Sequence, residues 1–215
     1  MIKIALDIMG GDNAPQSNIN GAIDFFKKNQ GSVKIYMVGN KKYILSELEK
    51  NKNIPNDTFE IIHTSQIIDS NDKPSRIIKT KPDSSMNKAI CLLKDNIVDA
   101  VISSGNTGCL VSSSFFNLGT IEGVKRPALF TIIPSEKGNF LLGDVGANPS
   151  SKPEQLLQFS KMASIFAKYQ LKINDPKIGL LNIGSEPNKG TELIKETYSL
   201  MNNELDKSKD FFMEL

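Results

Sequence analysis

Short apolar runs alternate with longer segments of helical periodicity along this 215-residue chain, and this alternation is the strongest constraint on its fold. A parallel strand pair needs a long crossover between its members, and helices usually supply it. The pattern therefore predicts an α/β fold with a largely parallel sheet. The candidate strands are Ile2–Asp7, Val33–Val38, Phe59–His63, Ala100–Ser103, Ala128–Ile133, Phe140–Asp144 and Lys177–Asn182.

Four segments between these strands carry apolar residues at helical spacing, which predicts a helix in each. Two local signals support helix starts: Pro153-Glu154 suits a first helical turn, and Asp83-Ser84-Ser85 resembles a cap. The apolar positions are Ile19, Ala22, Ile23 and Phe26; Met86, Ala89, Ile90, Leu93 and Ile97; Leu156, Phe159, Ala163 and Phe166; and Leu193, Ile194, Thr197, Leu200 and Met201.

These elements predict one α/β domain over residues 1–201 and a separate tail over residues 202–215. The tail begins polar and ends on an apolar cluster. Two interpretations remain open: the chain stops before its fold is complete, or a terminal helix docks Phe211 and Phe212 on the core.

Composition excludes several classes of protein. Twenty-six basic residues stand against twenty-four acidic ones, a balance that argues against a nucleic-acid partner. Cys91, Cys109 and the single histidine, His63, are too few for a disulfide framework or a metal cluster, so no metal is predicted. No apolar run approaches the roughly 20 residues that span a bilayer, and no signal peptide is evident. The prediction is a cytoplasmic protein.

Glycine-rich loops follow four of the predicted strands. Because the carboxyl ends of parallel strands share one edge of a sheet, we expect the four loops to lie together, where open α/β folds bind ligands. Each loop opens a helix, whose free N–H groups and dipole favour an anion. The loops are Met9–Pro15, Ser104–Gly108, Val145–Asn148 and Ile183–Gly190.

The residue types in these loops predict an oxyanion or phosphate pocket. Glycines permit close backbone approach, Ser, Thr and Asn supply neutral hydrogen bonds, and Lys189 supplies a positive charge. A glycine-rich turn also occurs for steric reasons alone, so any single loop is a weak signal. Neither a nucleotide-binding glycine motif nor a GxSxG elbow is present. Chemistry at this edge would therefore depend on positioning and electrostatics rather than on a side-chain nucleophile.

The segment Asp72–Lys88 is basic, with five basic residues against two acidic ones. One interpretation is a solvated loop and helix start. The other is a surface that attracts an acidic partner protein or a phosphorylated substrate. The sequence leaves both open.

Several of these motifs together resemble one family, the bacterial phosphate acyltransferases of phospholipid synthesis (PlsX family). They occur in the family's order and cover nearly everything from Met1 to about Met201. The matching segments are Asp7–Asp12, Lys81–Met86, Ser104–Gly108, Asp144–Asn148, Lys152–Phe159, Gly179–Gly184 and Lys189-Gly190.

This resemblance implies a Rossmann-like three-layer α/β/α fold of the isopropylmalate dehydrogenase and phosphotransacetylase type, in a homodimer. It implies transfer of a fatty acyl group from acyl carrier protein to inorganic phosphate, without cofactor or metal. A membrane-bound glycerol-3-phosphate acyltransferase then uses the acyl phosphate. The enzyme would therefore be cytoplasmic, with peripheral association at the inner face of the membrane as a further expectation.

Loop chemistry and resemblance together indicate the site residues. Lys189 is the expected catalytic cation, and Asn106 and Asn148 are expected to orient substrates. Carrier-protein binding is assigned to Arg76, Lys79, Lys81 and Lys88. Substrate and phosphate binding is assigned to Asp7, Gly10, Gly11, Asp12, Ser104, Gly105, Thr107, Gly108, Asp144, Gly146 and Gly184.

The chain departs from the family pattern in two respects. Asn13 stands where the family commonly has histidine, which removes a proton-transfer group there. Family members also continue with further strands, a helical hairpin and a glycine-rich segment, so the fold is expected to be C-terminally incomplete. The alternative function is therefore a truncated, inactive remnant that still binds acyl carrier protein. A nucleotide-binding dehydrogenase relative is disfavoured by the missing dinucleotide motif.

Overall fold

The structure is a computed structural model of the chain and describes all residues except 30–31, 52–57, 137, 185–188, 205–210 and 215. Contacts between Cα atoms divide it into two compact parts, unit 1 (Met1–Gly119) and unit 2 (Thr120–Leu215). The predicted division at residue 201 stays a prediction.

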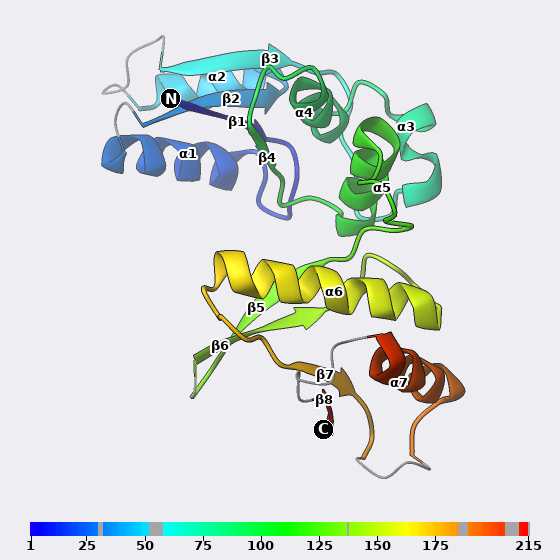
Figure 1. Cartoon of the computed structure of the whole chain (residues 1–215). Helices are drawn as coiled ribbons and strands as arrows, with labels where there is room; N and C mark the ends of the chain where they lie inside the picture. Colours follow the sequence, from blue (N-terminus) through cyan, green and yellow to red (C-terminus); the bar gives the residue numbers. More distant parts are fainter. Residues whose placement is uncertain (30–31, 52–57, 137, 185–188, 205–210, 215) are drawn as a thin grey trace. The chain divides into compact units, whose positions relative to one another are not determined.

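Unit 1 contains a four-stranded parallel sheet with the strand order β3-β2-β1-β4 (Figure 1). Its strands are β1 (Ile2–Asp7), β2 (Val33–Gly39), β3 (Phe59–His63) and β4 (Ala100–Ile102). Its helices are α1 (Gln16–Lys28), α2 (Lys41–Glu49), α3 (Ile77–Thr80), α4 (Ser85–Lys94) and α5 (Thr107–Leu118), with a short 3-10 helix η1 (Pro74–Arg76). The predicted α/β class with a parallel sheet is confirmed.

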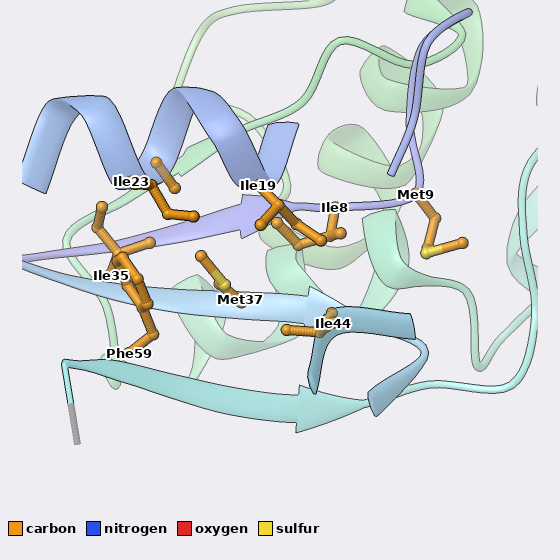
Figure 2. Packing of buried hydrophobic residues seen from close by; sticks show 9 residues of the cluster. Ile8, Met9, Ile19, Ile23, Ile35, Met37, Ile44 and Phe59 are labelled. Carbon is orange, nitrogen blue, oxygen red and sulfur yellow. The ribbon is translucent and has the colours of Figure 1, made fainter. Parts of the chain in front are cut away.

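Helices cover both faces of this sheet because the side chains of β2 alternate between two cores. Ile35 and Met37 point to one face and pack in a cluster with Ile19 of α1 (Figure 2). Val38 belongs to the opposite cluster, with Ala89 of α4. Unit 1 is thus a three-layer α/β/α arrangement, as the family resemblance implied.

Side-chain caps fix the starts of α2 and α4 in unit 1. The Asn40 side chain accepts a hydrogen bond from the Lys42 N–H at 3.1 Å and begins α2. The Ser84 hydroxyl oxygen accepts one from the Asn87 N–H at 3.4 Å and begins α4, which confirms the predicted cap. Such caps satisfy N–H groups that a helix cannot bond internally.

Unit 2 is built from smaller sheets. The strands β5 (Phe130–Ser135) and β6 (Gly138–Gly143) form an antiparallel hairpin. The strands β7 (Ile178–Leu181) and β8 (Phe211–Glu214) form a separate parallel pair. Two helices accompany them, α6 (Pro153–Gln170) and α7 (Glu192–Glu204), where helices were predicted.

The hairpin corrects one prediction. The strands near residues 130 and 140 were expected to share a parallel sheet with the others. Only two residues separate β5 from β6, and a parallel connection needs a dozen or more, so the strands pair antiparallel. Of the four glycine-rich loops, only those after β1 and β4 therefore follow strands of the same sheet in the described structure.

The core of unit 2 forms between its two helices and β7. Leu157 of α6, Leu180 of β7 and Met201 of α7 are buried together. Beyond α7, the described backbone of Phe211–Glu214 is a strand rather than the terminal helix considered above. Among the helices that the structure describes, none is long and apolar enough to cross a bilayer.

Candidate functional site

The loop after β1 is anchored by the carboxyl group of Asp7, which is 1% exposed. One oxygen accepts the Met9 N–H at 3.2 Å, and the other accepts the Ser103 hydroxyl at 2.7 Å. Ser103 Oγ in turn accepts the Gly105 N–H at 3.1 Å. Asp7 thus holds its own loop through Oδ1 and joins it to the loop after β4 through Oδ2, and its predicted role in substrate binding stays a prediction.

Asn18 of α1 holds the same loop from the other side. Its amide nitrogen lies 3.2, 3.0 and 2.7 Å from the carbonyl oxygens of Asp7, Ile8 and Gly10. The sequence analysis missed this residue. Its signal was a polar side chain next to the buried Ile19, on the first turn of a helix that directly follows a glycine-rich loop.

Glycines bring the two loops into direct contact. A Cβ atom on Gly10 would lie 2.5 Å from Asp7 Oδ2 and 2.9 Å from the Gly105 nitrogen. Ser104 Oγ donates to the Gly10 carbonyl at 2.8 Å. Gly11 has φ +100°, a conformation that other residues rarely adopt. The structure thus brings these predicted site residues together at the carboxyl edge of the unit 1 sheet.

A cavity of about 540 Å³ opens beside these loops. It offers neutral hydrogen-bonding groups from Ser104 and Thr107 and the acidic side chains of Asp12 and Asp69. The sequence analysis missed the third wall of this cavity, because residues 67–70 carry no periodic pattern. The lining residues are Met9, Gly11, Asp12, Ala14, Ile67, Ile68, Asp69, Ser70, Ser104, Gly105, Asn106 and Thr107.

The side chain of Asn106 links the cavity wall to the start of α5. Its Oδ1 accepts the Cys109 N–H at 3.0 Å as the helix cap, and its Nδ2 donates to the Ser70 carbonyl at 3.0 Å. Gly108 is the second residue of α5, where an added Cβ would lie 2.8 Å from Pro74 Cγ. Both residues thus have packing or positioning contacts, and their predicted roles toward substrates stay predictions.

Lys81 is held between two acidic side chains. Its Nζ is 2.8 Å from Asp69 Oδ2 and also bonds Asp72. Burial lowers the pKa of Lys81, but the hydrogen bonds with Asp69 and Asp72 outweigh it, and the net pKa lies above the usual value. The same hydrogen bond from Lys81 lowers the pKa of Asp72. Lys81 is therefore charged and engaged within unit 1.

The rest of the predicted carrier-protein surface is open. Arg76, Lys79 and Lys88 are exposed. Asp83 interrupts this basic segment: its carboxylate accepts both the Ser65 hydroxyl at 2.6 Å and the Ser65 N–H at 2.8 Å. These hydrogen bonds lower the pKa of Asp83.

In unit 2, the loop after β6 is organised around Asp144. Its carboxyl oxygens accept the N–H groups of Leu129, Ala147 and Asn148 at 3.0, 3.2 and 2.9 Å. The Asn148 amide donates to Asp144 Oδ2 at 2.6 Å and to the Pro127 carbonyl at 3.0 Å. Gly146 turns the loop with φ +105°. Asp144 and Asn148 thus form a closed hydrogen-bonded turn.

The loop before α7 is described only in part, and Ser185–Asn188 lie outside the described residues. The Asn182 amide donates to the Gly184 carbonyl at 2.9 Å. A Cβ on Gly190, which has φ +88°, would lie 2.3 Å from Asn182 Oδ1. Lys189 is exposed, and its side chain has no hydrogen bond or ion pair with any described residue.

Among the residues that the structure describes, no group of three His, Cys, Asp or Glu side chains could hold a metal ion.

Comparison with known proteins identifies relatives over nearly the whole chain. The profile of the family described as "Fatty acid synthesis protein" matches residues 2–212. A phosphate acyltransferase of Clostridium botulinum is 43% identical over 203 residues, and one of Clostridium tetani is 42% identical over 202 residues. Each match covers 94% of this chain and 60% of the relative. The chain thus spans about three-fifths of the length of these curated relatives.

Solved structures with the same fold have more distant sequences. A phosphotransacetylase from Staphylococcus aureus superposes with a TM-score of 0.63 at 17% identity. A branched-chain phosphotransacylase from Enterococcus faecalis gives 0.61 at 14% identity. Both comparisons cover all of this chain and 68% of the other one. The fold type implied by the motif resemblance is confirmed.

Proposed function

The chain belongs to the fatty acid synthesis protein family, and from this membership we propose that it transfers a fatty acyl group from acyl carrier protein to inorganic phosphate. The observation that carries the proposal is the pair of contacting loops after β1 and β4. They present glycine backbone, hydroxyl groups and a helix N-terminus to one cavity. Relatives named phosphate acyltransferase, at about 43% identity, support the same reaction.

The proposed reaction needs no nucleophilic side chain. A phosphate oxygen attacks the thioester carbonyl carbon, a C–O bond forms, and the C–S bond breaks. The proton of the phosphate hydroxyl leaves with the carrier-protein sulfur as a thiol. The protein's part is to hold phosphate near the carbonyl and to stabilise the developing oxyanion with fixed donors. Ser104, Thr107 and the free N–H groups at the start of α5 are donors of this kind.

Lys81 is engaged with Asp69 and Asp72, so its charge is already balanced. The catalytic cation in this proposal is Lys189, on the ground of its positive charge in a glycine-rich loop and of the family resemblance. Asn106 and Asn148, whose side-chain amide nitrogens both donate to partners within the chain, become positioning residues in this proposal.

The donor protein in this proposal is acidic and binds the exposed basic side chains of Arg76, Lys79 and Lys88. Complementary charge mainly raises the association rate. The proposal also includes a homodimer and delivery of the acyl phosphate to a membrane-bound glycerol-3-phosphate acyltransferase, as the resemblance implies.

The test is phosphate-dependent release of carrier-protein thiol from a long-chain acyl carrier protein by the purified chain. We expect Lys189→Ala to reduce turnover by about 10²–10³-fold, the usual loss for a missing transition-state donor. Lys168→Ala, another exposed lysine, is the control and should leave turnover unchanged. Full turnover by Lys189→Ala would refute the role of Lys189.

The exposed basic side chains of Arg76, Lys79 and Lys88 also support a second candidate function: binding of acyl carrier protein without catalysis. It predicts no thiol release and a salt-sensitive complex with the carrier protein. Replacing Arg76, Lys79 and Lys88 with Glu should then abolish the complex, while Lys27→Glu on α1 should not.

A further inference from the structure

The turn at residues 69–72 supplies part of the wall of the cavity in unit 1, since Asp69 and Ser70 belong to its lining. Residues 67–73 belong to no helix or strand, so contacts with neighbouring elements fix their place. The Asp72 N–H donates to the Asp69 carbonyl at 3.2 Å, and Asp72 Oδ2 accepts the Asp69 N–H at 2.7 Å. These two bonds close the 69–72 turn but do not attach it to the rest of the unit.

Lys81 attaches the 69–72 turn to the segment that precedes α4. Its Nζ lies 2.8 Å from Asp69 Oδ2 and 2.5 Å from Asp72 Oδ2. Both carboxylates carry the same charge, so they would repel each other if the ammonium between them were removed. A single side chain therefore holds both ends of the turn.

The main chain of Lys81 is itself fixed by a buried polar network. Its carbonyl accepts the side-chain amide of Asn87 at 2.8 Å, and Asn87 Oδ1 accepts the Ser113 hydroxyl at 2.5 Å. Asn87 of α4 is 2% exposed and Ser113 of α5 is 0% exposed. Buried polar groups with satisfied hydrogen bonds restrict the positions that their elements can take. Lys81 thus connects the 69–72 turn to α4 and α5.

The start of α5 holds the same turn directly. Asn106 Nδ2 donates to the Ser70 carbonyl at 3.0 Å, and Cys109 Sγ donates to the Asp72 carbonyl at 3.7 Å. Asn106 is also a lining residue of the cavity. The distance between the turn and the start of α5, and with it the shape of the cavity there, therefore depends on both attachments.

Charge gives Lys81 a second effect on the cavity. Asp69 and Asp12 are the acidic residues of the lining, and the Asp69 side chain is 71% exposed. A cleft lined by carboxylates repels an anion, because charges of one sign add their fields there. The Lys81 ammonium offsets the charge of Asp69 by direct contact, although Lys81 is not itself a lining residue.

We propose that Lys81 is a positioning residue for inorganic phosphate in the cavity of unit 1. Through Asp69 and Asp72 it seats the 69–72 turn beside α5, and its charge makes the lining acceptable to an anion. Lys81 acts through these two carboxylates and does not contact phosphate. The inference rests on the proposed function, which supplies phosphate as the ligand of this cavity.

The first test needs no ligand. Lys81→Met keeps the apolar stem of the side chain and removes its charge. The amide hydrogens of Asp69 and Asp72 should then exchange at least about tenfold faster than in the parent, because the turn is no longer held. Lys94→Met removes an exposed lysine at the end of α4 and should leave both exchange rates unchanged. Unchanged exchange in Lys81→Met would overturn the proposal.

The second test titrates inorganic phosphate into each protein and follows the backbone amide signals of Gly11, Ser104 and Thr107 by NMR. Lys81→Met should weaken phosphate binding at least about tenfold, whereas Lys81→Arg keeps the charge and should stay within about threefold of the parent. In the thiol-release assay the same loss should appear in the KM for phosphate, with kcat within about twofold, because Lys81 touches no reacting atom. A loss confined to kcat would contradict the proposal.

The outcomes separate this inference from the proposed reaction. Equal phosphate affinity in Lys81→Met and the parent, or an equal loss in Lys94→Met, would overturn the role of Lys81 and leave the reaction untouched. A parent chain that releases no thiol but binds phosphate more tightly than Lys81→Met would refute the reaction and support the inference. A parent chain that binds no phosphate would overturn both. If Lys81→Met does not fold, Lys81→Gln takes its place, because it also lacks the charge and keeps a hydrogen-bond donor.

Discussion

Units 1 and 2 differ in how completely they cover their apolar side chains. Unit 1 has helices on both faces of one sheet, and Ile8, Ile19 and Met37 are 0% exposed. Large apolar side chains are exposed in both units, for example Phe116 of α5 and Leu181 of β7, so the difference lies in how many apolar side chains are buried. The buried apolar side chains described there are Leu157, Phe159, Ala167, Leu180 and Met201.

This difference separates two kinds of site. The loops after β1 and β4 are fixed by contacts within unit 1, so their geometry needs nothing further. Unit 2 instead has an apolar cavity whose lining includes exposed side chains such as Phe140 and Leu181. The first site is a polar pocket between hydrogen-bonded loops, whereas the second is an open apolar cavity.

The largest expected difference between the units is the loss of stability when an apolar side chain is shortened to alanine. Met37→Ala in unit 1 should cost about 2–5 kcal/mol of unfolding free energy, because it leaves a cavity in a closed core. Phe140→Ala in unit 2 should cost about 0.5 kcal/mol, as at other surface positions. Amide hydrogen exchange of the full chain, analysed separately for each unit, measures both losses of unfolding free energy. Equal losses in the two variants would contradict the contrast between the units.

A second test concerns the contact of the two loops. Gly10→Ala should destabilise unit 1 by about 1–3 kcal/mol, because the added methyl group overlaps Asp7 and Gly105. Gly21→Ala on α1 is the matched control, with open space around its Cβ. It should stabilise the helix by about 0.5–1 kcal/mol. Urea unfolding measures the free energy of unfolding of both variants. An unchanged value for Gly10→Ala would show that the two loops are not in close contact.

A third test compares the two asparagines expected to orient substrates. Asn106→Ala removes a helix cap and should cost about 1 kcal/mol, and Asn148→Ala removes two hydrogen bonds and should cost about 1–2 kcal/mol. If both position their loops, thermal stability falls together with activity. Loss of activity without any loss of stability would indicate that the amides contact substrate directly.

The smallest expected effect is a pH dependence within unit 1. The lowered pKa of Asp83 means that its hydrogen bonds to Ser65 stabilise the fold above the unfolded pKa of about 3.9. That contribution is lost as the pH falls through the lowered folded-state pKa. Asp83→Asn should therefore be less stable than the parent at neutral pH, and the gap should close in acid. A gap that stays constant between pH 6 and pH 2 would contradict this.

Sequence patterns predicted the four strands of unit 1 and the helices α1 and α4, because each strand there has a long crossover and a buried face. They did not single out α2 as a helix. The same patterns found β5 and β6 but not their antiparallel pairing, since a short apolar run looks alike in either arrangement. The signal for antiparallel pairing was the connection of only two residues between β5 and β6. Because this signal was not used, all four glycine-rich loops were expected to share one edge of a sheet.

At the candidate site, the sequence predicted which residues lie close together better than it predicted which contacts their side chains make. Gly10, Gly11, Ser104 and Gly105 lie together as expected, because β1 and β4 are neighbours. Asp7 and Lys81 were expected to bind ligands, but their partners lie up to 96 positions away or in an irregular loop. No local pattern encodes such contacts.

The hydrogen bond between Ser103 and Asp7 also sets an order of events during synthesis. It joins residues 96 positions apart: Asp7 ends the first strand of the unit 1 sheet, and Ser103 directly follows the last one. A nascent chain that has completed only β1, β2 and β3 possesses the first glycine loop but not the partner that shapes it. The loop geometry at this edge of the sheet is thus completed in a single late step, when β4 docks.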